Sequence, residues 1–189
     1  MKSLTRTPHP RLLAQHLAAP VAVLTAHHDG HEHGTTVSTL TRVSHRPLLI
    51  AAALRAGSVL AGLAAAEGRF AVNVLGGGQA DLARWFASSN RPYGSLQFAT
   101  VDWRPDPYTG APLLDGALAH FACRLSGTCV VGDHEVVLGH VVRVDRGGGA
   151  PLLSYAGELC AGDLRPAAAG PKSPGQAPAL SSDAKEQSS

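Results

Sequence analysis

Short runs of apolar and β-branched residues recur along most of this chain, and Gly, Pro, Asp and Asn interrupt them. Such runs, bounded by turn-forming residues, are typical of β-strands. They predict strands over residues 21–25, 35–43, 48–54, 70–75, 98–103, 117–125, 127–131, 135–144 and 152–155. The run 48–54 is apolar throughout, which indicates a strand buried on both faces. Many short strands separated by turns favour a barrel or a sandwich.

Three segments show the spacing of helices instead. They cover residues 10–17, the segment from Ser58 to Gly68, and the residues that follow the triple glycine at 76–78. Ser is a residue type that caps helix starts, and Gly often ends helices. The sequence therefore predicts a small antiparallel barrel with two or three helices on its outside.

The length of 189 residues suffices for one domain with a substantial core. We expect a helical lead over 1–20, a single domain over 21–162 and a tail over 163–189. The tail is rich in Pro, Ala, Gly and Ser, and it holds few large apolar side chains. Too little apolar surface is available there to offset the entropy of ordering, so we expect the tail to be disordered.

Charge and cysteine content narrow the class of protein. Sixteen Lys and Arg against 14 Asp and Glu give a formal charge of +2, and the basic residues are scattered, so we expect no nucleic-acid partner. No apolar run is long enough to cross a membrane. The three cysteines form no CxxC pair and follow no secretory leader, which predicts a reduced, cytoplasmic protein.

The first candidate for chemistry is His134, which follows a Gly132-Asp133 turn between two β-branched runs. Gly and Asp together favour a tight hairpin turn. An imidazole changes its charge near neutral pH, and a ligand can reach it at the end of a hairpin. A structural histidine also suits this position, so both interpretations stay open here.

Hydroxyl side chains gather in the segment 34–44. In an extended strand one face carries Thr36, Ser38 and Ser44, and the opposite face carries Thr39. Buried hydroxyls need hydrogen-bond partners, which a polar ligand can supply. Thr is also common in strands for packing reasons alone.

The start of the second predicted helix is another candidate site. Arg55 and Ser58 stand beside it, and a guanidinium, a hydroxyl and free helix N–H groups together suit a phosphate. A capped helix beside a solvated Arg explains the same residues.

Three other patterns are incomplete. The segment 27–33 holds four histidines, but no second ligand set completes a zinc shell. No Gly-x-Ser-x-Gly turn indicates a serine hydrolase. The glycines at 76–78 lack the Gly-x-Gly-x-x-Gly spacing of dinucleotide-binding loops.

Several blocks of the chain nevertheless form a recognisable series. They are residues 34–39, 43–44 with Pro47, 68–75, 81–84, 86–87, 110–119, Cys123 and 132–139. In this order they resemble the flavin reductase-like family, the small NAD(P)H:flavin oxidoreductases that supply reduced flavin to two-component monooxygenases. The resemblance spans roughly residues 21 to 157.

The resemblance implies an antiparallel Greek-key split β-barrel, usually a homodimer, that binds FMN or FAD and uses NADH or NADPH as co-substrate. A flavin-dependent monooxygenase would receive the reduced flavin. The implied contacts are Thr36, Ser38 and Thr39 for the isoalloxazine edge, Ser44, Arg55, Ser58 and Arg84 for the ribityl phosphate, and His134 with Tyr155 for the nicotinamide nucleotide.

Two other functions stay open at this point. Pro20, Leu40 and the segment from Ser58 depart from residues that the family usually carries near its flavin groove. The same fold can therefore host another cofactor-dependent reaction on a biosynthetic metabolite. A flavin-binding or metal-binding accessory protein that uses the histidine-rich segment is the third hypothesis.

Overall fold

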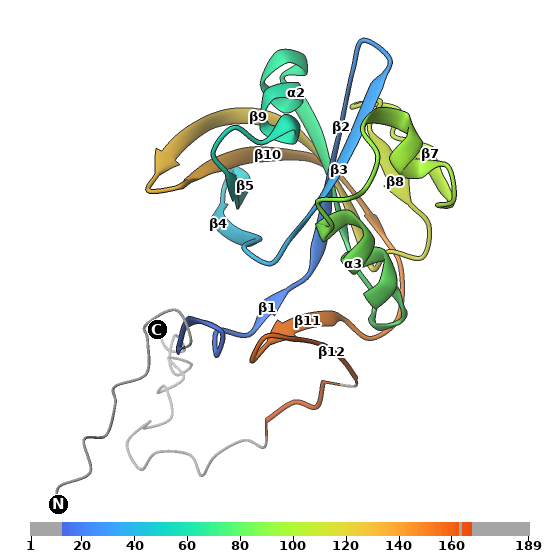
Figure 1. The fold of residues 1–189 in the computed structure, drawn as a ribbon. Helices are drawn as coiled ribbons and strands as arrows, with labels where there is room; N and C mark the ends of the chain where they lie inside the picture. Colours follow the sequence, from blue (N-terminus) through green and yellow to red (C-terminus); the bar gives the residue numbers. More distant parts are fainter. Residues whose placement is uncertain (1–12, 163, 168–189) are drawn as a thin grey trace, which may run out of the picture.

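A computed structural model describes residues 13–162 and 164–167. Its centre is a seven-stranded antiparallel sheet with the strand order β3-β2-β6-β9-β10-β5-β4, which curls into an open, split barrel (Figure 1). The strands are β2 (Ala22–His28), β3 (His31–Val37), β4 (Thr41–His45), β5 (Leu48–Arg55), β6 (Arg69–Val74), β9 (Ala119–Val131) and β10 (His134–Arg146).

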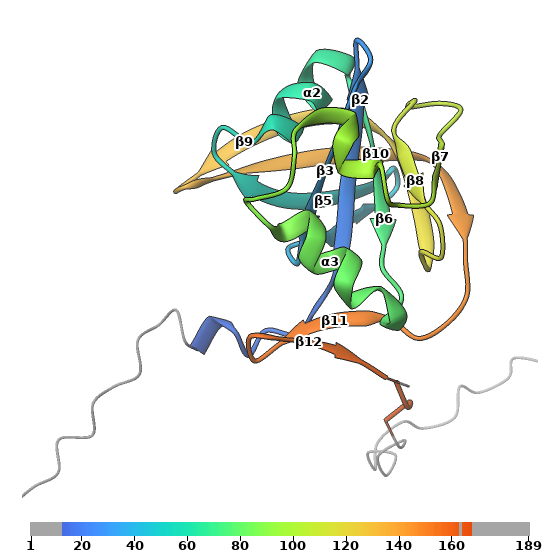
Figure 2. The ribbon, with the colours of Figure 1, turned by 45° about the vertical axis from the view of Figure 1, so that its right-hand side comes forward.

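Two smaller sheets accompany the barrel. Figure 2 shows the first of them at one end of the molecule, where β11 lies between β1 and β12. The second pairs β7 with β8. Their strands are β1 (Ala19–Pro20), β11 (Leu152–Tyr155), β12 (Glu158–Ala161), β7 (Trp103–Pro105) and β8 (Pro112–Leu114).

The strand β2 is buried on both faces because a helix covers each side. Leu24 belongs to the cluster that contains residues of α2 (Val59–Glu67), and Val23 packs in a second cluster with residues of α3 (Ala80–Ala87). The alternation of side chains along a strand sends neighbouring residues to opposite faces. The predicted helices at 58–68 and after 76–78 are therefore confirmed, and they lie on opposite sides of this strand.

The first hairpin of the sheet turns within the histidine-rich segment 27–33. Strand β2 runs to His28, β3 resumes at His31, and only Asp29 and Gly30 form the turn, with φ of 48° and 74°. Two central residues with positive φ give the type I′ geometry that Asp-Gly favours, because its twist matches that of the strands. The histidines of this segment therefore stand on two paired strands.

The predicted strand over 35–43 is wrong, because the chain breaks it in the middle. Strand β3 ends at Val37 and β4 begins at Thr41. Between them the Thr39 hydroxyl donates to the carbonyl of Ala53 at 3.0 Å and accepts from the N–H of the same residue at 2.9 Å. A hydroxyl that bonds the backbone in this way replaces a ladder contact.

The hairpin of β9 and β10 is longer than predicted, with 13 residues in each strand. The expected interruption near residue 126 is only a register shift opposite Leu138 and Gly139. A Cβ on Gly139 would lie 2.6 Å from the Phe70 ring, so this close approach requires glycine.

Three other expectations differ from the structure or lie outside it. A 3₁₀ helix, η2 (Gly94–Phe98), and the late start of β7 replace the strand predicted over 98–103, and β12 was not predicted. Residues 10–12 of the lead helix predicted over 10–17 lie outside the described residues, as do residue 163 and the tail from residue 168 onward. Of the described part, Leu13 and Ala14 are helical and residues 15–17 form a turn. Each helix in the described ranges is too short or too polar to cross a membrane.

Candidate functional site

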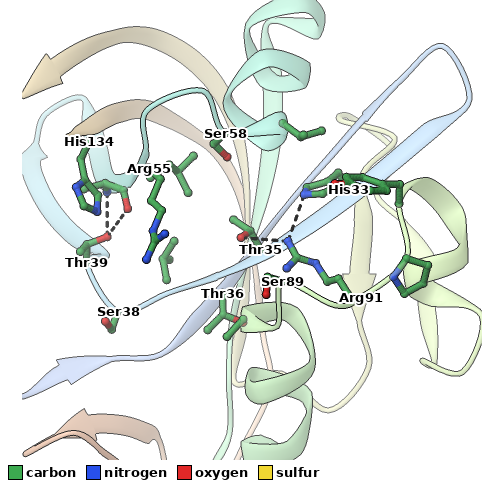
Figure 3. A pocket seen from close by; sticks show the side chains of 17 residues that line it. His33, Thr35, Thr36, Ser38, Thr39, Arg55, Ser58, Ser89, Arg91 and His134 are labelled. Carbon is green, nitrogen blue, oxygen red and sulfur yellow. Dashed lines mark hydrogen bonds between the residues drawn. The ribbon is translucent and has the colours of Figure 1, made fainter.

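One side of the barrel holds a cavity of about 670 Å³ (Figure 3). Five segments border it: β3 with the residues that follow it, the end of β5, the start of α2, the loop after α3, and the first residue of β10. Its lining residues are His33, Thr35, Thr36, Val37, Ser38, Thr39, Ala53, Leu54, Arg55, Ser58, Val59, Ala87, Ser89, Arg91, Pro92, Tyr93 and His134. The set combines hydroxyls, two guanidinium groups and two imidazoles, and it contains no carboxylate.

A second cavity, of about 660 Å³, lies elsewhere and is lined mainly by glycines. Its one charged side chain belongs to Asp115, and Gln79 is its other functional polar side chain. Few of the groups that orient a ligand are present there, so the first cavity is the better candidate.

The hydroxyl segment predicted to meet a ligand does border the first cavity, but two of its hydroxyls already have partners. Thr36 Oγ1 donates to the Ala83 carbonyl of α3 at 2.7 Å, and the Thr39 hydroxyl bridges to β5. Ser38 is exposed beside them. Thr36 and Thr39 therefore tie this wall together, and they have lone pairs and backbone groups rather than free O–H protons to offer.

The turn before β10 brings His134 to the same cavity. His134 pairs in register with Arg55 at the end of β5, and the Ala56 N–H donates to the Asp133 carbonyl at 3.1 Å. The His134 Nδ1 lies 2.7 Å from an Asp133 carboxylate oxygen. The imidazole is thereby oriented at the cavity, as the sequence led us to expect from its place in the hairpin.

Ser58 stands at the N-cap position of α2 but does not cap it with its side chain. It is half-buried and borders the cavity near Arg55 (Figure 3). The capping role that the sequence suggested is therefore wrong, and the hydroxyl is placed where a ligand can reach it.

Three of the predicted contacts do not border the cavity. Arg84 is exposed on α3 and pairs with Asp81 at 2.8 Å. Ser44 lies on β4, and Tyr155 lies on β11 with its ring 5.9 Å from that of His16. Their proposed roles stay predictions from the family resemblance.

The structure also shows a polar cluster that sequence reasoning missed. His33, which borders the cavity, and Gln97, which does not, are both buried, with Gln97 Nε2 2.8 Å from His33 Nδ1, and Arg91 lies beside them in the lining. Burial and the charge of Arg91 lower the pKa of His33 from 6.5 to about 4, so the imidazole is neutral near pH 7. An isolated Arg in a polar loop gives no periodic signal that could have identified it.

The histidine-rich hairpin forms no metal centre. His28 Nδ1 lies 3.1 Å from Glu67 Oε2, and His31 Nδ1 lies 2.9 Å from the Asp29 carbonyl. Within the described residues, no group of three or more His, Cys, Asp or Glu side chains is arranged to hold a metal ion.

The fold and the cavity together define a class: an antiparallel split barrel with a polar cavity that is lined by guanidinium groups and hydroxyls. Comparison with known families specifies the class: residues 14–163 match the model of the flavin reductase like domain. The chain therefore belongs to the flavin reductase-like family, and it is an oxidoreductase.

Individual relatives agree with this assignment. An NADPH-flavin oxidoreductase of Streptomyces viridifaciens is 41% identical over 150 residues, covering 79% of this chain and 77% of the relative. The reductase component of a Rhodococcus opacus 4-nitrophenol 4-monooxygenase/4-nitrocatechol 2-monooxygenase is 31% identical over 149 residues, covering 79% and 77%.

Solved structures show the same fold. BorF, the flavin reductase component of a bacterial two-component tryptophan halogenase, aligns with a TM-score of 0.76 at 30% identity. The alignment covers 82% of this chain and 98% of BorF. The predicted fold class is thus confirmed.

Proposed function

We propose that this protein is an NAD(P)H-dependent flavin reductase that uses FMN, or FAD, and passes the reduced flavin to a partner monooxygenase. The observation that supports it most directly is the lining of the first cavity. Two guanidinium groups and several hydroxyls face a space that no carboxylate borders, which suits anionic, polar ligands such as nucleotides.

The residues of this cavity fit a flavin nucleotide. The volume of about 670 Å³ lies within the ordinary range of small-molecule sites. Arg55 and Ser58 supply a cation and a hydroxyl at one side, which suits the phosphate. Thr36 borders the cavity near its centre in Figure 3, and Ser38 and Thr39 border it on the side of His134 and Arg55; these three residues would meet the edge of the ring.

A bound flavin supplies the chemistry of accepting a hydride at N5 from the nicotinamide. The residues of this chain have to hold the two rings in a reactive geometry and exclude water. We assign His134 to the nicotinamide nucleotide, because the Asp133 carboxylate orients its imidazole at the cavity. Its task is positioning the nicotinamide ring rather than moving a proton.

The partner follows from the relatives. Two of them are reductase components of two-component systems, one with a monooxygenase and one with a halogenase. We propose that this chain also serves a flavin-dependent monooxygenase, acts in the cytoplasm, and forms a homodimer in which Ser44 and Tyr155 keep the roles that the resemblance implies.

Anaerobic flavin reduction tests the proposal. A catalytic amount of the purified protein is mixed with free FMN and excess NADH or NADPH. The flavin absorbance should be bleached within minutes, and a mixture without protein should keep its absorbance. FAD in place of FMN identifies the preferred flavin. Absence of protein-dependent bleaching with both nucleotides and both flavins would overturn the proposed function.

A further inference from the structure

The loop over residues 88–93 forms a wall of the first cavity that the proposed flavin contacts leave unused. It carries Arg91, Pro92 and Tyr93 into the lining. Figure 3 shows Arg91 and Arg55 on opposite sides of the cavity, with Thr35 and Thr36 between them. The second cation therefore faces the space from the side away from Arg55 and Ser58.

Several hydrogen bonds hold the Arg91 side chain in place. Its guanidinium donates to the carbonyls of Ser88 and Gly34 and to the Gln97 side-chain oxygen. In the described residues no carboxylate lies within ion-pair distance of it. Burial without a counter-charge lowers the pKa of Arg91 and is unfavourable, so an anion in the cavity would stabilise the group.

The buried side chains of His33 and Gln97, which contact Arg91, also favour an anion at this place. The two ring nitrogens of His33 face Arg91 Nη2 at 3.3 Å and Gln97 Nε2 at 2.8 Å, and both partners are donors. A neutral imidazole has only one acceptor nitrogen. Turning the Gln97 amide would set its nitrogen against the N–H groups of Gly34 and Arg91, which now donate to its oxygen.

One donor in this cluster therefore always faces another donor. Such an excess of N–H groups makes the local potential positive. An anion placed before the guanidinium would balance it, whereas a neutral ligand would not.

The same loop also presents an aromatic ring. Tyr93 is 81% exposed, although it borders the cavity two residues from Arg91. An exposed ring beside a fixed cation is a combination that can bind a base by stacking and its phosphate by charge. The flavin contacts proposed above include neither Arg91 nor Tyr93.

We propose that the 88–93 loop binds the adenosine half of the nicotinamide dinucleotide, with Arg91 on a phosphate of that half and Tyr93 stacked on the adenine. His33 and Gln97 are positioning residues that hold the guanidinium. The inference extends the proposed reductase function, because it names the subsite that holds the co-substrate.

Binding of ADP-ribose, which carries the adenosine half without the nicotinamide, tests the subsite without requiring turnover. In titration calorimetry of the full chain, Arg91→Gln should weaken ADP-ribose binding by roughly tenfold or more. Arg91→Lys should restore part of the loss. The control is Arg146→Gln, since Arg146 is exposed on β10 and does not border the cavity, and it should bind like the wild type.

The phosphate of FMN is the other anion that Arg91 could meet, and a parallel titration separates the two. If Arg91→Gln weakens FMN but not riboflavin, and leaves ADP-ribose binding unchanged, the subsite belongs to the flavin and the inference is overturned. Unchanged binding of all these probes overturns it as well.

Kinetics with reduced nicotinamide mononucleotide provide a second test at an exposed residue. Tyr93→Ala should raise KM for NADH or NADPH about fivefold to tenfold, whereas Tyr93→Phe should retain the wild-type value. KM for the mononucleotide, which lacks the adenosine half, should not change. An equal rise for the mononucleotide would contradict the proposal, and this variant answers the question even if Arg91→Gln fails to fold.

The two levels of proposal fail in different ways. A wild-type protein that binds ADP-ribose through Arg91 but bleaches no flavin would refute the reductase function and leave the subsite intact. If the wild-type protein reduces flavin but the Arg91 and Tyr93 variants bind ADP-ribose and NADH or NADPH normally, the adenosine subsite is refuted and the reductase function stands.

Discussion

The cavity has two walls that each carry one guanidinium group but are built in different ways. We call the ends of β5 and β10, with Arg55 and His134, the first wall, and the loop 88–93, with the buried His33 and Gln97, the second wall. The first wall stands on regular strands: the register of β5 with β10 places His134 opposite Arg55. The second wall is an irregular loop, and side-chain hydrogen bonds from Arg91 to Gln97 and to the Gly34 carbonyl hold it. Backbone ladders thus fix the first wall, and a few polar side chains fix the second.

Because of this difference, substitutions in the two walls should have different consequences. A substitution on the first wall removes one group and leaves the ladder in place, because backbone bonds do not depend on the side chain. A substitution among the buried residues of the second wall leaves polar partners unsatisfied, which costs about 1–3 kcal/mol for each group. We therefore expect substitutions in the first wall to change ligand affinity alone, and substitutions in the second wall to change both ligand affinity and the free energy of unfolding.

The largest effect on the first wall should come from Arg55→Gln. Loss of a charged hydrogen bond worth about 1.5–3 kcal/mol should raise the dissociation constant for FMN by roughly 10–100-fold, measured by fluorescence quenching. Riboflavin, which lacks the phosphate, serves as the control and should bind as before. Equal weakening of both flavins would show that Arg55 acts on the fold or the ring instead.

His134→Ala should have a smaller and more selective effect. KM for NADH or NADPH should rise about tenfold, while the dissociation constant for FMN changes less than threefold, because the imidazole contacts the nicotinamide nucleotide. Steady-state kinetics with separate flavin titrations measure both quantities. A matching loss of both affinities would indicate a structural histidine.

The pH dependence of stability should reveal the contribution of His33 in the second wall. The folded-state pKa of His33 is about 4, against an ordinary 6.5 in the unfolded chain. The unfolded state therefore binds more protons between these values, so the free energy of unfolding should fall as the pH drops from about 6.5 towards 4. Above pH 6.5 this group should contribute no slope.

Urea denaturation at a series of pH values measures that slope. His33→Gln, which cannot take up a proton, should flatten the curve between pH 4 and 6.5 relative to the wild type. Identical slopes in both proteins would show that His33 is not the group responsible.

The smallest effect should come from Arg84→Gln. Arg84 is exposed and paired with Asp81 one helical turn away, an arrangement worth only a few tenths of a kcal/mol. From this geometry alone, FMN affinity should change less than twofold. A tenfold loss would instead support the phosphate role that the family resemblance implies.

The first wall was largely readable from the sequence, and the reasons are local. A Gly-Asp pair between β-branched runs specifies a hairpin, and the residue after it must lie at the hairpin end. The apolar run before Arg55 specifies a buried strand that ends at that residue. Because both signals are local, they placed His134 and Arg55 at strand ends, although apart from the resemblance no local signal paired the two residues.

The second wall was not readable, because its contacts join distant parts of the chain. Gln97 lies 64 residues from His33, and neither stands in a periodic pattern that would identify it. The break at Thr39 was missed for a related reason: Thr favours strands in general, and only the bond to Ala53 shows that this residue interrupts the strand.

Gly34 supports the second wall through its backbone alone. Its N–H donates to Gln97, its carbonyl accepts from Arg91, and a Cβ at this position would lie 2.6 Å from the Phe86 ring of α3. The missing side chain lets α3 pack directly on β3, and α3 leads into the 88–93 loop. Gly34 thus sets the distance between β3 and α3. Any larger residue would push α3 outward and increase the distance between the guanidinium groups of Arg55 and Arg91.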